Sequence, residues 1–327
     1  MLVATAKLRL IIICLVLAAL SPAIRAVSPE QSATLAVAEP TPLSGTLSST
    51  GSDTLHNMMM IWRRQFVALH PQLNLQIQSS GSATAPVALL EGTASLGPMS
   101  RPMLSVEQER FRHRFGYDAI AVPVALDMLA LYVHQDNPLR SISMAQLESI
   151  YAQNRLCHRQ VAIERWGELG LAGAWQSRPV AAYGRNPASG TYSFFRQQVL
   201  CEGDYQQRVQ QLPGAAAVVR AVSQSVNAIG YSGVGQQIAG VKILALQADA
   251  NSPALMPTPE HAISGRYPLA RVLYIYLNKA PARPLPAAEQ AFLRFILSAE
   301  GQALLSNDGL VPVPAALRAQ AIQELGL

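Results

Sequence analysis

Residues 185–195 read Arg-Asn-Pro-Ala-Ser-Gly-Thr-Tyr-Ser-Phe-Phe, and this stretch says more about the fold than any other part of the chain. An apolar run from Val180 to Tyr183 precedes it and predicts a strand. The run from Tyr192 to Leu200 predicts a helix. The Pro and Gly residues between the two runs mark a polar turn. The sequence therefore predicts a strand–turn–helix unit here.

Ser189, Gly190 and Thr191 stand at the expected start of this helix. Unpaired backbone N–H groups and the positive end of the helix dipole make such a position favourable for an anion. Arg185 adds a planar set of donors that suits a tetrahedral oxyanion. The alternative is a capped helix with no ligand, because Ser-Gly-Thr is common before helices.

The same order of elements occurs earlier in the chain. Residues 45–48 indicate a short strand, and Gly51-Ser52-Asp53-Thr54 indicates a turn. Apolar residues then recur at helical spacing from Leu55 to Leu69, and His70-Pro71 ends the helix.

Two further units follow. Residues 73–77 alternate as in a strand, and the turn at residues 79–82 leads to a helix that ends near residue 92. Residues 95–97 and the turn at 99–102 precede a helix in which Ser105 and Gln108 have the spacing of a capping box. Repeated strand–turn–helix units predict an α/β fold, with the polar turns at the carboxyl edge of the sheet, where ligands bind.

Two long apolar stretches, residues 120–133 and 266–278, predict strands that cross between two lobes. Residues 45–125 plus 268–327 would form a discontinuous lobe 1, and residues 126–267 would form lobe 2. The C-terminal part predicts two helices and a last strand at residues 310–314; the helices are expected at residues 287–297 and 299–305.

The N-terminus has the pattern of an export signal. Lys7 and Arg9 precede the apolar run Leu10 to Leu20, and cleavage is expected after Ala23 or Ala26. The run is short for a bilayer span, but a membrane anchor is the alternative. Residues 1–26 are thus interpreted as a signal peptide and residues 27–44 as a flexible leader, which predicts a periplasmic protein.

The charge of the chain argues against a nucleic-acid partner. The formal net charge is +5, and removal of residues 1–26 takes away three basic residues and no acidic one, which leaves +2. Lys and Arg do not cluster together with aromatic residues anywhere in the sequence.

Two cysteines, Cys157 and Cys201, remain after cleavage. In an exported protein they are most simply one disulfide, although two buried free thiols are the alternative. The His residues are scattered, and Cys157-His158 has no second pair in the nearby sequence, so no metal site is expected. No cofactor is expected either.

Five motifs occur in order along the chain. They are Gly51-Ser52-Asp53-Thr54, Ser79-Ser80-Gly81, Gly97-Pro98-Met99-Ser100-Arg101-Pro102, Arg185-Asn186-Pro187-Ala188-Ser189-Gly190-Thr191 and Ala228-Ile229-Gly230-Tyr231. With them, the chain resembles the phosphate-binding proteins of ABC-type phosphate importers, within the type II periplasmic binding proteins. The resemblance covers most of residues 45–315. It implies a two-lobed α/β fold with a ligand cleft between lobes joined by crossing strands.

The resemblance also implies a set of site residues and partners. The implied phosphate-binding residues are Asp53, Thr54, Ser79, Ser100, Arg185, Ser189, Gly190 and Thr191. The implied function is capture of inorganic phosphate and its delivery to an ABC-type membrane permease by a monomer that is not an enzyme.

The chain departs from the best-known members of the family at two positions. They carry an aspartate where this chain has Ser100, and that carboxylate accepts a proton from phosphate and helps to reject sulfate. They carry a second aspartate, which pairs with the arginine, where this chain has Pro187. We hypothesise that Asp53 accepts the phosphate proton instead; the alternative is that Asp53 only caps a helix. The loss of the acid at Pro187 leaves Arg185 less restrained and the site more positive, which suits a dianion; the alternative is that Arg185 pairs with an acid distant in the sequence.

Other functions stay open at this stage. An enzyme acting on phosphoesters would need an activated nucleophile or a metal cluster, and Gly-x-Ser-x-Gly is absent. An exported anion-binding protein for sensing, secretion or adhesion would use the same cleft. The ligand could also be another oxyanion, such as sulfate, molybdate or phosphonate.

Overall fold

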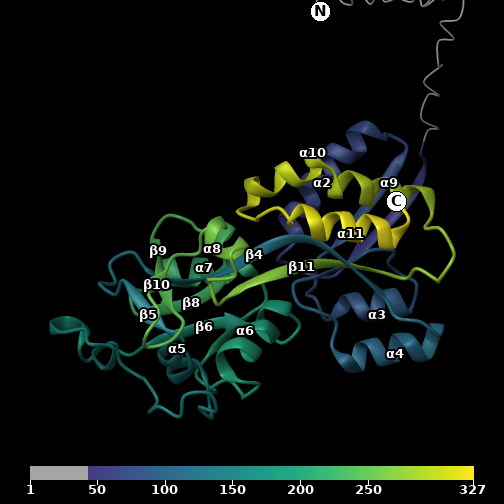
Figure 1. Cartoon of the computed structure of the whole chain (residues 1–327). Coiled ribbons are helices and arrows are strands. Elements are labelled where there is room, and N and C mark those ends of the chain that lie inside the picture. Colours follow the sequence, from purple (N-terminus) through teal and green to yellow (C-terminus); the bar gives the residue numbers. More distant parts are fainter. Residues whose placement is uncertain (1–42) are drawn as a thin grey trace, which may run out of the picture. The chain divides into compact units, whose positions relative to one another are not determined.

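Parallel strands alternate with helices in the first third of the chain, as the turn pattern predicts. The computed structural model describes residues 43–327 (Figure 1). The predicted signal peptide and all but the last two residues of the predicted leader lie outside the described residues. Within residues 43–327, no helix is long and apolar enough to span a membrane.

The described strands are β1 (Gly45–Thr50), β2 (Leu73–Gln78), β3 (Gly97–Met99), β4 (Ile120–His134), β5 (Ser141–Ser143), β6 (Ala181–Arg185), β7 (Gln210–Leu212), β8 (Ala228–Gly233), β9 (Val241–Gln247), β10 (Ala254–Leu255) and β11 (Ala270–Leu277). The α-helices are α2 (His56–Leu69), α3 (Thr84–Leu90), α4 (Ser105–Phe115), α5 (Met144–Tyr151), α6 (Gly190–Leu200), α7 (Ala215–Gln224), α8 (Pro259–Ile263), α9 (Ala287–Leu297), α10 (Ala299–Ala303) and α11 (Ala315–Leu325). Short 3-10 turns occur at Trp166–Leu169, Gly173–Trp175, Val234–Gln236 and Leu304–Asp308.

The strands form a mixed sheet of nine and a parallel pair. The order β10-β9-β4-β8-β6-β7 runs through the large sheet, with β11 beside β4, β3 beside β11, and β5 beside β9. β1 and β2 pair in parallel, and the Thr50 N–H donates to the Leu96 carbonyl at 3.1 Å, next to β3. β1, β2 and β3 are therefore neighbours, and each leads into a polar turn at its carboxyl end.

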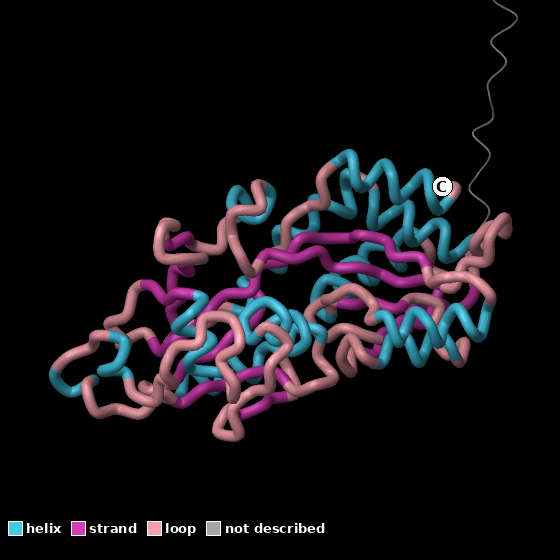
Figure 2. Tube along the Cα trace, turned by 60° about the horizontal axis from the view of Figure 1, so that its bottom comes forward, coloured by secondary structure: helices cyan, strands magenta, loops and turns pink. Residues whose placement is uncertain are grey.

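β4 and β11 are the long antiparallel strands that the two apolar stretches predict. They run side by side in both views, and β4 pairs with β11 from Ile120 to Met128 and with β8 from Leu129 to Val133 (Figures 1 and 2). Pro123 lacks an N–H for a ladder bond, and the register between the strands shifts opposite it, between Leu273 and Tyr274. The predicted α/β class is therefore confirmed, and the structure adds that its large sheet is mixed.

Two main groups of buried apolar side chains hold these elements. One group draws on residues 128–269 together with Val311, and includes Tyr151, Trp166 and Phe195. The other draws on residues 47–125 and 273–325, with Trp62 and Phe66 from α2. Burial of large apolar side chains supplies most of the driving force for folding.

Three details differ from the sequence-based predictions. Residues 310–314 make a single bridge, between Val311 and Leu126, and not a full strand. The chain then continues into α11, a helix that the sequence analysis did not predict. The N-terminus of α4 is closed by Glu107, which accepts from the Leu104 N–H at 2.7 Å, and the predicted capping by Gln108 is wrong. The Glu107 carboxylate also holds Arg101, which explains why this residue takes the capping role.

Candidate functional site

Turns from distant parts of the sequence meet at the start of α6. The Thr54 and Thr191 hydroxyl oxygens lie 3.1 Å apart and are buried. The Ala83 N–H donates to the Ala188 carbonyl at 3.1 Å, which joins the turn after β2 to the turn after β6. The structure thus brings the predicted anion turn of residues 185–191 next to the turns near residues 54 and 82.

The start of α6 is built by local hydrogen bonds. Ser189 has extended backbone dihedrals, and its hydroxyl accepts from the Thr191 N–H at 3.1 Å, which is the geometry of an N-cap. Ser189, Gly190 and Thr191 are all buried. The predicted helix is confirmed, and it begins at Gly190, two residues earlier than the apolar pattern suggests.

Gly190 allows a close approach between two parts of the site. A Cβ atom at this position would clash with the hydroxyl oxygens of Ser82 and Ser100. Glycine therefore lets the first turn of α6 pack directly against these two buried serines. The two hydroxyl oxygens lie 3.1 Å apart.

Arg185 is the main cationic group of this cluster, and only 1% of it is exposed. Its Nη2 lies 2.8 Å from the Asp53 Oδ2 and donates to the Pro213 carbonyl at 3.0 Å. Its Nε and Nη1 have no hydrogen-bond partner among the described residues. Buried donors without partners are costly, so this arrangement favours a ligand with several acceptor atoms.

Asp53 is the acidic partner of Arg185 that the sequence could not identify. Its Oδ2 also accepts from the Ala215 N–H at the start of α7, at 3.2 Å. In the best-known family members, the arginine pairs with an aspartate at the position where this chain has the exposed Pro187. Here Asp53 makes that pair instead. The contact differs from the hypothesised role of Asp53 as the acceptor of a phosphate proton, which stays a prediction.

A second buried ion pair lies beside the site and was missed by the sequence analysis. Arg271 on β11 contacts Asp127 on β4 through Nε at 2.9 Å and Nη2 at 2.7 Å. Arg271 also donates to the Thr191 Oγ1 at 2.9 Å and to the Ser100 carbonyl at 3.1 Å. The sequence did carry a signal for this pair. Asp127 and Arg271 are charges of opposite sign, and each lies inside one of the two apolar stretches that were expected to form paired strands.

The turn after β2 contributes a different serine from the one predicted. The Ser79 hydroxyl contacts the His56 Nδ1 at 2.9 Å in an exposed position, and it is not part of the buried cluster. Ser82 is buried instead, and its hydroxyl accepts from the Ser100 N–H at 3.0 Å. Three serines follow each other closely in this turn, so the sequence alone could not decide which one faces the cluster.

Ser52 is another residue that the sequence analysis did not select. Its hydroxyl oxygen is buried and has no partner among the described residues. The backbone N–H of Ser52 donates to the Pro98 carbonyl at 2.8 Å, which fixes the first turn against β3. Ser52 thus adds one more hydroxyl group without a partner in the described part of the chain, in the same turn as Asp53 and Thr54.

Tyr231 holds the carboxyl end of β6 through a hydrogen bond. Its hydroxyl accepts from the Arg185 N–H at 3.3 Å and lies 2.8 Å from the Tyr205 hydroxyl. Burial raises the pKa of Tyr231 to about 12, so the phenol stays neutral near neutral pH. Its role is to hold the backbone of Arg185 in place.

Cys157 and Cys201 form the predicted disulfide. Cys201 ends α6, and the loop after α5 carries Cys157. Glu148 is fully buried on α5 and accepts from the backbone N–H groups of Cys157 and His158 at 2.6 and 2.8 Å, and it contacts the His158 Nδ1 at 2.9 Å. The three residues are close enough to hold a metal, but the disulfide occupies the sulfur. The group instead fixes the loop to the helix.

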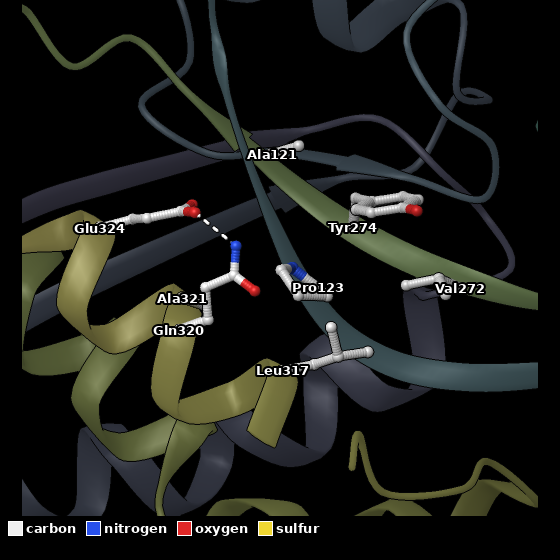
Figure 3. Close-up of a pocket in the computed structure, with 8 residues that line it drawn as sticks. All are labelled: Ala121, Pro123, Val272, Tyr274, Leu317, Gln320, Ala321 and Glu324. Atoms are coloured by element: carbon white, nitrogen blue, oxygen red, sulfur yellow. Dashed lines mark hydrogen bonds between the residues drawn. The ribbon is translucent and has the colours of Figure 1, made fainter. Parts of the chain in front are cut away.

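A separate pocket lies between β4, β11 and α11 (Figure 3). It has a volume of about 210 Å³ and is lined by Ala121, Pro123, Val272, Tyr274, Leu317, Gln320, Ala321 and Glu324. Gln320 donates to Glu324 at 2.8 Å on its rim. None of these residues belongs to the hydroxyl and arginine cluster, and the pocket offers no cation for an anion.

The fold and this buried cluster of donors define a class of protein, the type II periplasmic binding proteins. Residues 36–300 match the family described as the PBP superfamily domain. The chain is 48% identical to the phosphate-binding protein PstS of Pseudomonas aeruginosa over 285 residues, which cover 87% of this chain and 88% of that protein. The chain therefore belongs to the PBP superfamily, in the family of the phosphate-binding protein PstS.

Solved structures agree with this fold. A substrate-binding protein of a phosphate ABC transporter from Clostridium perfringens, with bound phosphate, has a TM-score of 0.70 at 23% identity and covers 83% of this chain and 100% of its own. An ABC-type phosphate transport receptor from Vibrio cholerae has a TM-score of 0.64 at 21% identity. The matched region covers 82% of this chain and 100% of that one. PstS of Pseudomonas aeruginosa, at 48% identity, is named as a phosphate-binding protein and not as an enzyme.

Proposed function

We propose that this protein captures inorganic phosphate outside the cytoplasm and delivers it to an ABC-type membrane permease. The observation that carries this proposal is the buried Arg185, whose Nε and Nη1 have no partner among the described residues. These donors lie in the cluster that contains the start of α6 and several buried hydroxyl groups. The 48% identity to the phosphate-binding protein PstS supports phosphate as the ligand.

The proposed binding residues come from four turns. They are Asp53 and Thr54, Ser79, Ser100, and Arg185, Ser189, Gly190 and Thr191, and the buried hydroxyl groups add Ser52 and Ser82. Asp53 would act by holding Arg185. Ser79 is the weakest member of the set, because its hydroxyl contacts His56. Charge-assisted hydrogen bonds contribute roughly 1.5–3 kcal/mol each, so about five of them could give micromolar affinity after desolvation.

Closure of two lobes is part of this proposal. We assign residues 45–125 and 268–327 to lobe 1 and residues 126–267 to lobe 2. The two main groups of buried apolar side chains follow nearly the same division, which supports it. β4 and β11 would be the connecting strands, and the Thr54–Thr191 and Asp53–Arg185 contacts would join the lobes around the ion.

The remaining parts of the proposal concern location and assembly. Export through the predicted signal peptide, with cleavage near Ala26, would place the mature protein in the periplasm as a monomer. Its partners would be phosphate and the permease. Permease and ATPase genes beside this gene would support delivery, whereas their absence would favour a role in sensing, secretion or adhesion.

Isothermal titration calorimetry of the mature protein with phosphate, sulfate and arsenate tests the binding function. We expect phosphate to bind with micromolar affinity or better. Arg185→Gln should weaken binding by at least about a hundredfold, because it removes the cationic donor of the site. Arg112→Gln is the matched control, since Arg112 forms an exposed pair with Asp118 away from the cluster. Absence of phosphate binding by a folded wild-type protein would refute the proposal.

A further inference from the structure

Arg271 connects three elements at the proposed site. Its buried guanidinium donates twice to Asp127 on β4, once to the Ser100 carbonyl after β3, and once to the Thr191 Oγ1 on α6. The guanidinium also lies over the Phe194 ring at 5.2 Å. Packing and hydrogen bonds therefore fix both the position and the direction of its N–H groups.

The contact with Arg271 sets the direction of the Thr191 hydroxyl. A guanidinium has only donors, so the Thr191 Oγ1 must accept from Arg271. The hydroxyl's own proton is then left to donate to another acceptor. In this structure the Thr54 Oγ1 lies 3.1 Å away, and an oxyanion would be a stronger acceptor for the same proton.

Two serines of the cluster are arranged in the same way. The Ser82 Oγ accepts from the Ser100 N–H at 3.0 Å, and the Ser189 Oγ accepts from the Thr191 N–H at 3.1 Å. Each hydroxyl thus accepts from a fixed N–H group and keeps its own proton to donate. Ser189 and Thr191 together present donors to whatever the site encloses. The Ser82 proton can go either to the same ligand or to the Ser100 Oγ, which lies 3.1 Å away.

The two carboxylates nearest the cluster are each paired with a guanidinium through one oxygen, Oδ2. Asp53 faces Arg185, and Asp127 faces Arg271. Two further titratable groups lie close by. His56 contacts Ser79, and Asp308 accepts from Asn57 at 3.2 Å.

We propose that Arg271 is a positioning residue that makes Thr191 a donor, and that the resulting donor-lined site selects tetrahedral oxyanions in their dianionic form. This inference rests on the proposed phosphate-binding function. It predicts that the site takes monohydrogen phosphate in preference to dihydrogen phosphate. It also predicts that sulfate, which has no proton to offer near neutral pH, competes measurably with phosphate.

The first test is calorimetry of the wild-type protein with phosphate and with sulfate at several pH values. Between about pH 6 and about pH 8, phosphate affinity should rise with the fraction of dianion. Sulfate affinity should change much less over the same range. Because sulfate stays doubly charged, its profile also reports any titration of His56, Asp308 or other protein groups.

Two outcomes of this test separate the inference from the proposed function. Phosphate binding that does not rise with pH, together with no sulfate competition at about a thousandfold excess, would overturn the donor-lined site and leave phosphate capture intact. Absence of phosphate binding at every pH would instead overturn the proposed function.

The second test is a double-mutant cycle on Arg271 and Thr191. Arg271→Lys and Thr191→Val should each weaken phosphate binding by about tenfold or more. Thr191→Val removes a donor directed at the ion, and Arg271→Lys removes the guanidinium that orients this donor. The double variant should be no weaker than Thr191→Val alone, since Arg271 acts through Thr191. Losses that multiply would overturn the positioning role.

Controls keep this cycle interpretable. Arg112→Lys, in the exposed pair with Asp118, should bind as the wild type does. Thr191→Ser should restore most of the affinity, because it returns the hydroxyl. If Arg271→Lys does not fold, Arg271→Gln combined with Asp127→Asn removes both buried charges together, and its loss should likewise not multiply with that of Thr191→Val.

Discussion

Thr54 and Thr191 share a buried hydrogen bond of 3.1 Å although 137 positions separate them in the sequence. Thr54 lies in the turn after β1, and Thr191 lies in the first turn of α6. The contact brings two helix starts together, and each helix start favours negative charge.

Asp53→Asn should lower phosphate affinity by about tenfold, because Arg185 loses the charge that holds its guanidinium in place. The ratio of phosphate to sulfate affinity should stay nearly constant if Asp53 acts by holding Arg185 through Oδ2 and does not itself accept a proton from phosphate. Competition calorimetry measures both quantities. A large fall in the ratio would show that Asp53 accepts the phosphate proton, as the sequence-based hypothesis states.

Gly190→Ala should weaken phosphate binding and destabilise the fold by roughly 1–3 kcal/mol, because the added methyl group would clash with the Ser82 and Ser100 hydroxyls. Gly214→Ala is the matched control, since a Cβ there meets only the Ala217 Cβ and N atoms, at 3.8 and 4.0 Å. Its cost should stay near or below about 1 kcal/mol. Urea unfolding measures the loss of stability, and calorimetry measures the loss of phosphate affinity. Equal losses for both variants would contradict the close packing at Gly190.

Reduction of the Cys157–Cys201 disulfide should lower the free energy of unfolding by roughly 3–4 kcal/mol, because the bridge closes a loop between residues 44 positions apart. Urea unfolding with and without reductant measures this loss. Cys157→Ser with Cys201→Ser provides the same comparison without reductant. Glu148 still holds the Cys157 and His158 N–H groups, so the reduced protein should keep binding phosphate when folded. Unchanged stability after reduction would argue against this account.

Asp308→Asn should stabilise the protein by about 1 kcal/mol at mildly alkaline pH, with the effect reduced by partial solvent exposure. Burial raises the pKa of the Asp308 carboxyl from 3.8 to about 6, so the folded protein binds this proton more tightly than the unfolded chain. The wild type therefore loses stability relative to the variant as pH rises from about 4 to about 6. Urea unfolding across this range measures the difference. A difference that shrinks with rising pH would falsify the assignment.

The repeated units of strand, polar turn and helix were predictable because local spacing carries their signal. The apolar spacing in Leu55 to Leu69 and the alternation in residues 73–77 each report a face that must be buried. The long strands β4 and β11 were found in the same way. The helix Ala315–Leu325 was missed because its apolar positions are weakly patterned and follow two prolines.

The site was only partly predictable from the sequence. Arg185, Ser189, Gly190 and Thr191 could be proposed from the sequence because they share one turn and one helix start. Ser82 could not be chosen over Ser79, since both lie in the same serine-rich turn and their directions depend on the packing of that turn. The two acids were harder still, because a carboxylate pairs through space and leaves no mark on local spacing.

The α/β class, the family motifs and the disulfide could be inferred from the order of amino acids alone, because each depends on short-range patterns or on residue type. The pairing of Asp53 with Arg185 and of Asp127 with Arg271 is visible only in the folded protein. These pairs depend on which turns meet when strands from distant parts of the sequence align. An unpaired buried charge is costly, so each of these carboxylates pairs with an arginine close to it in the fold.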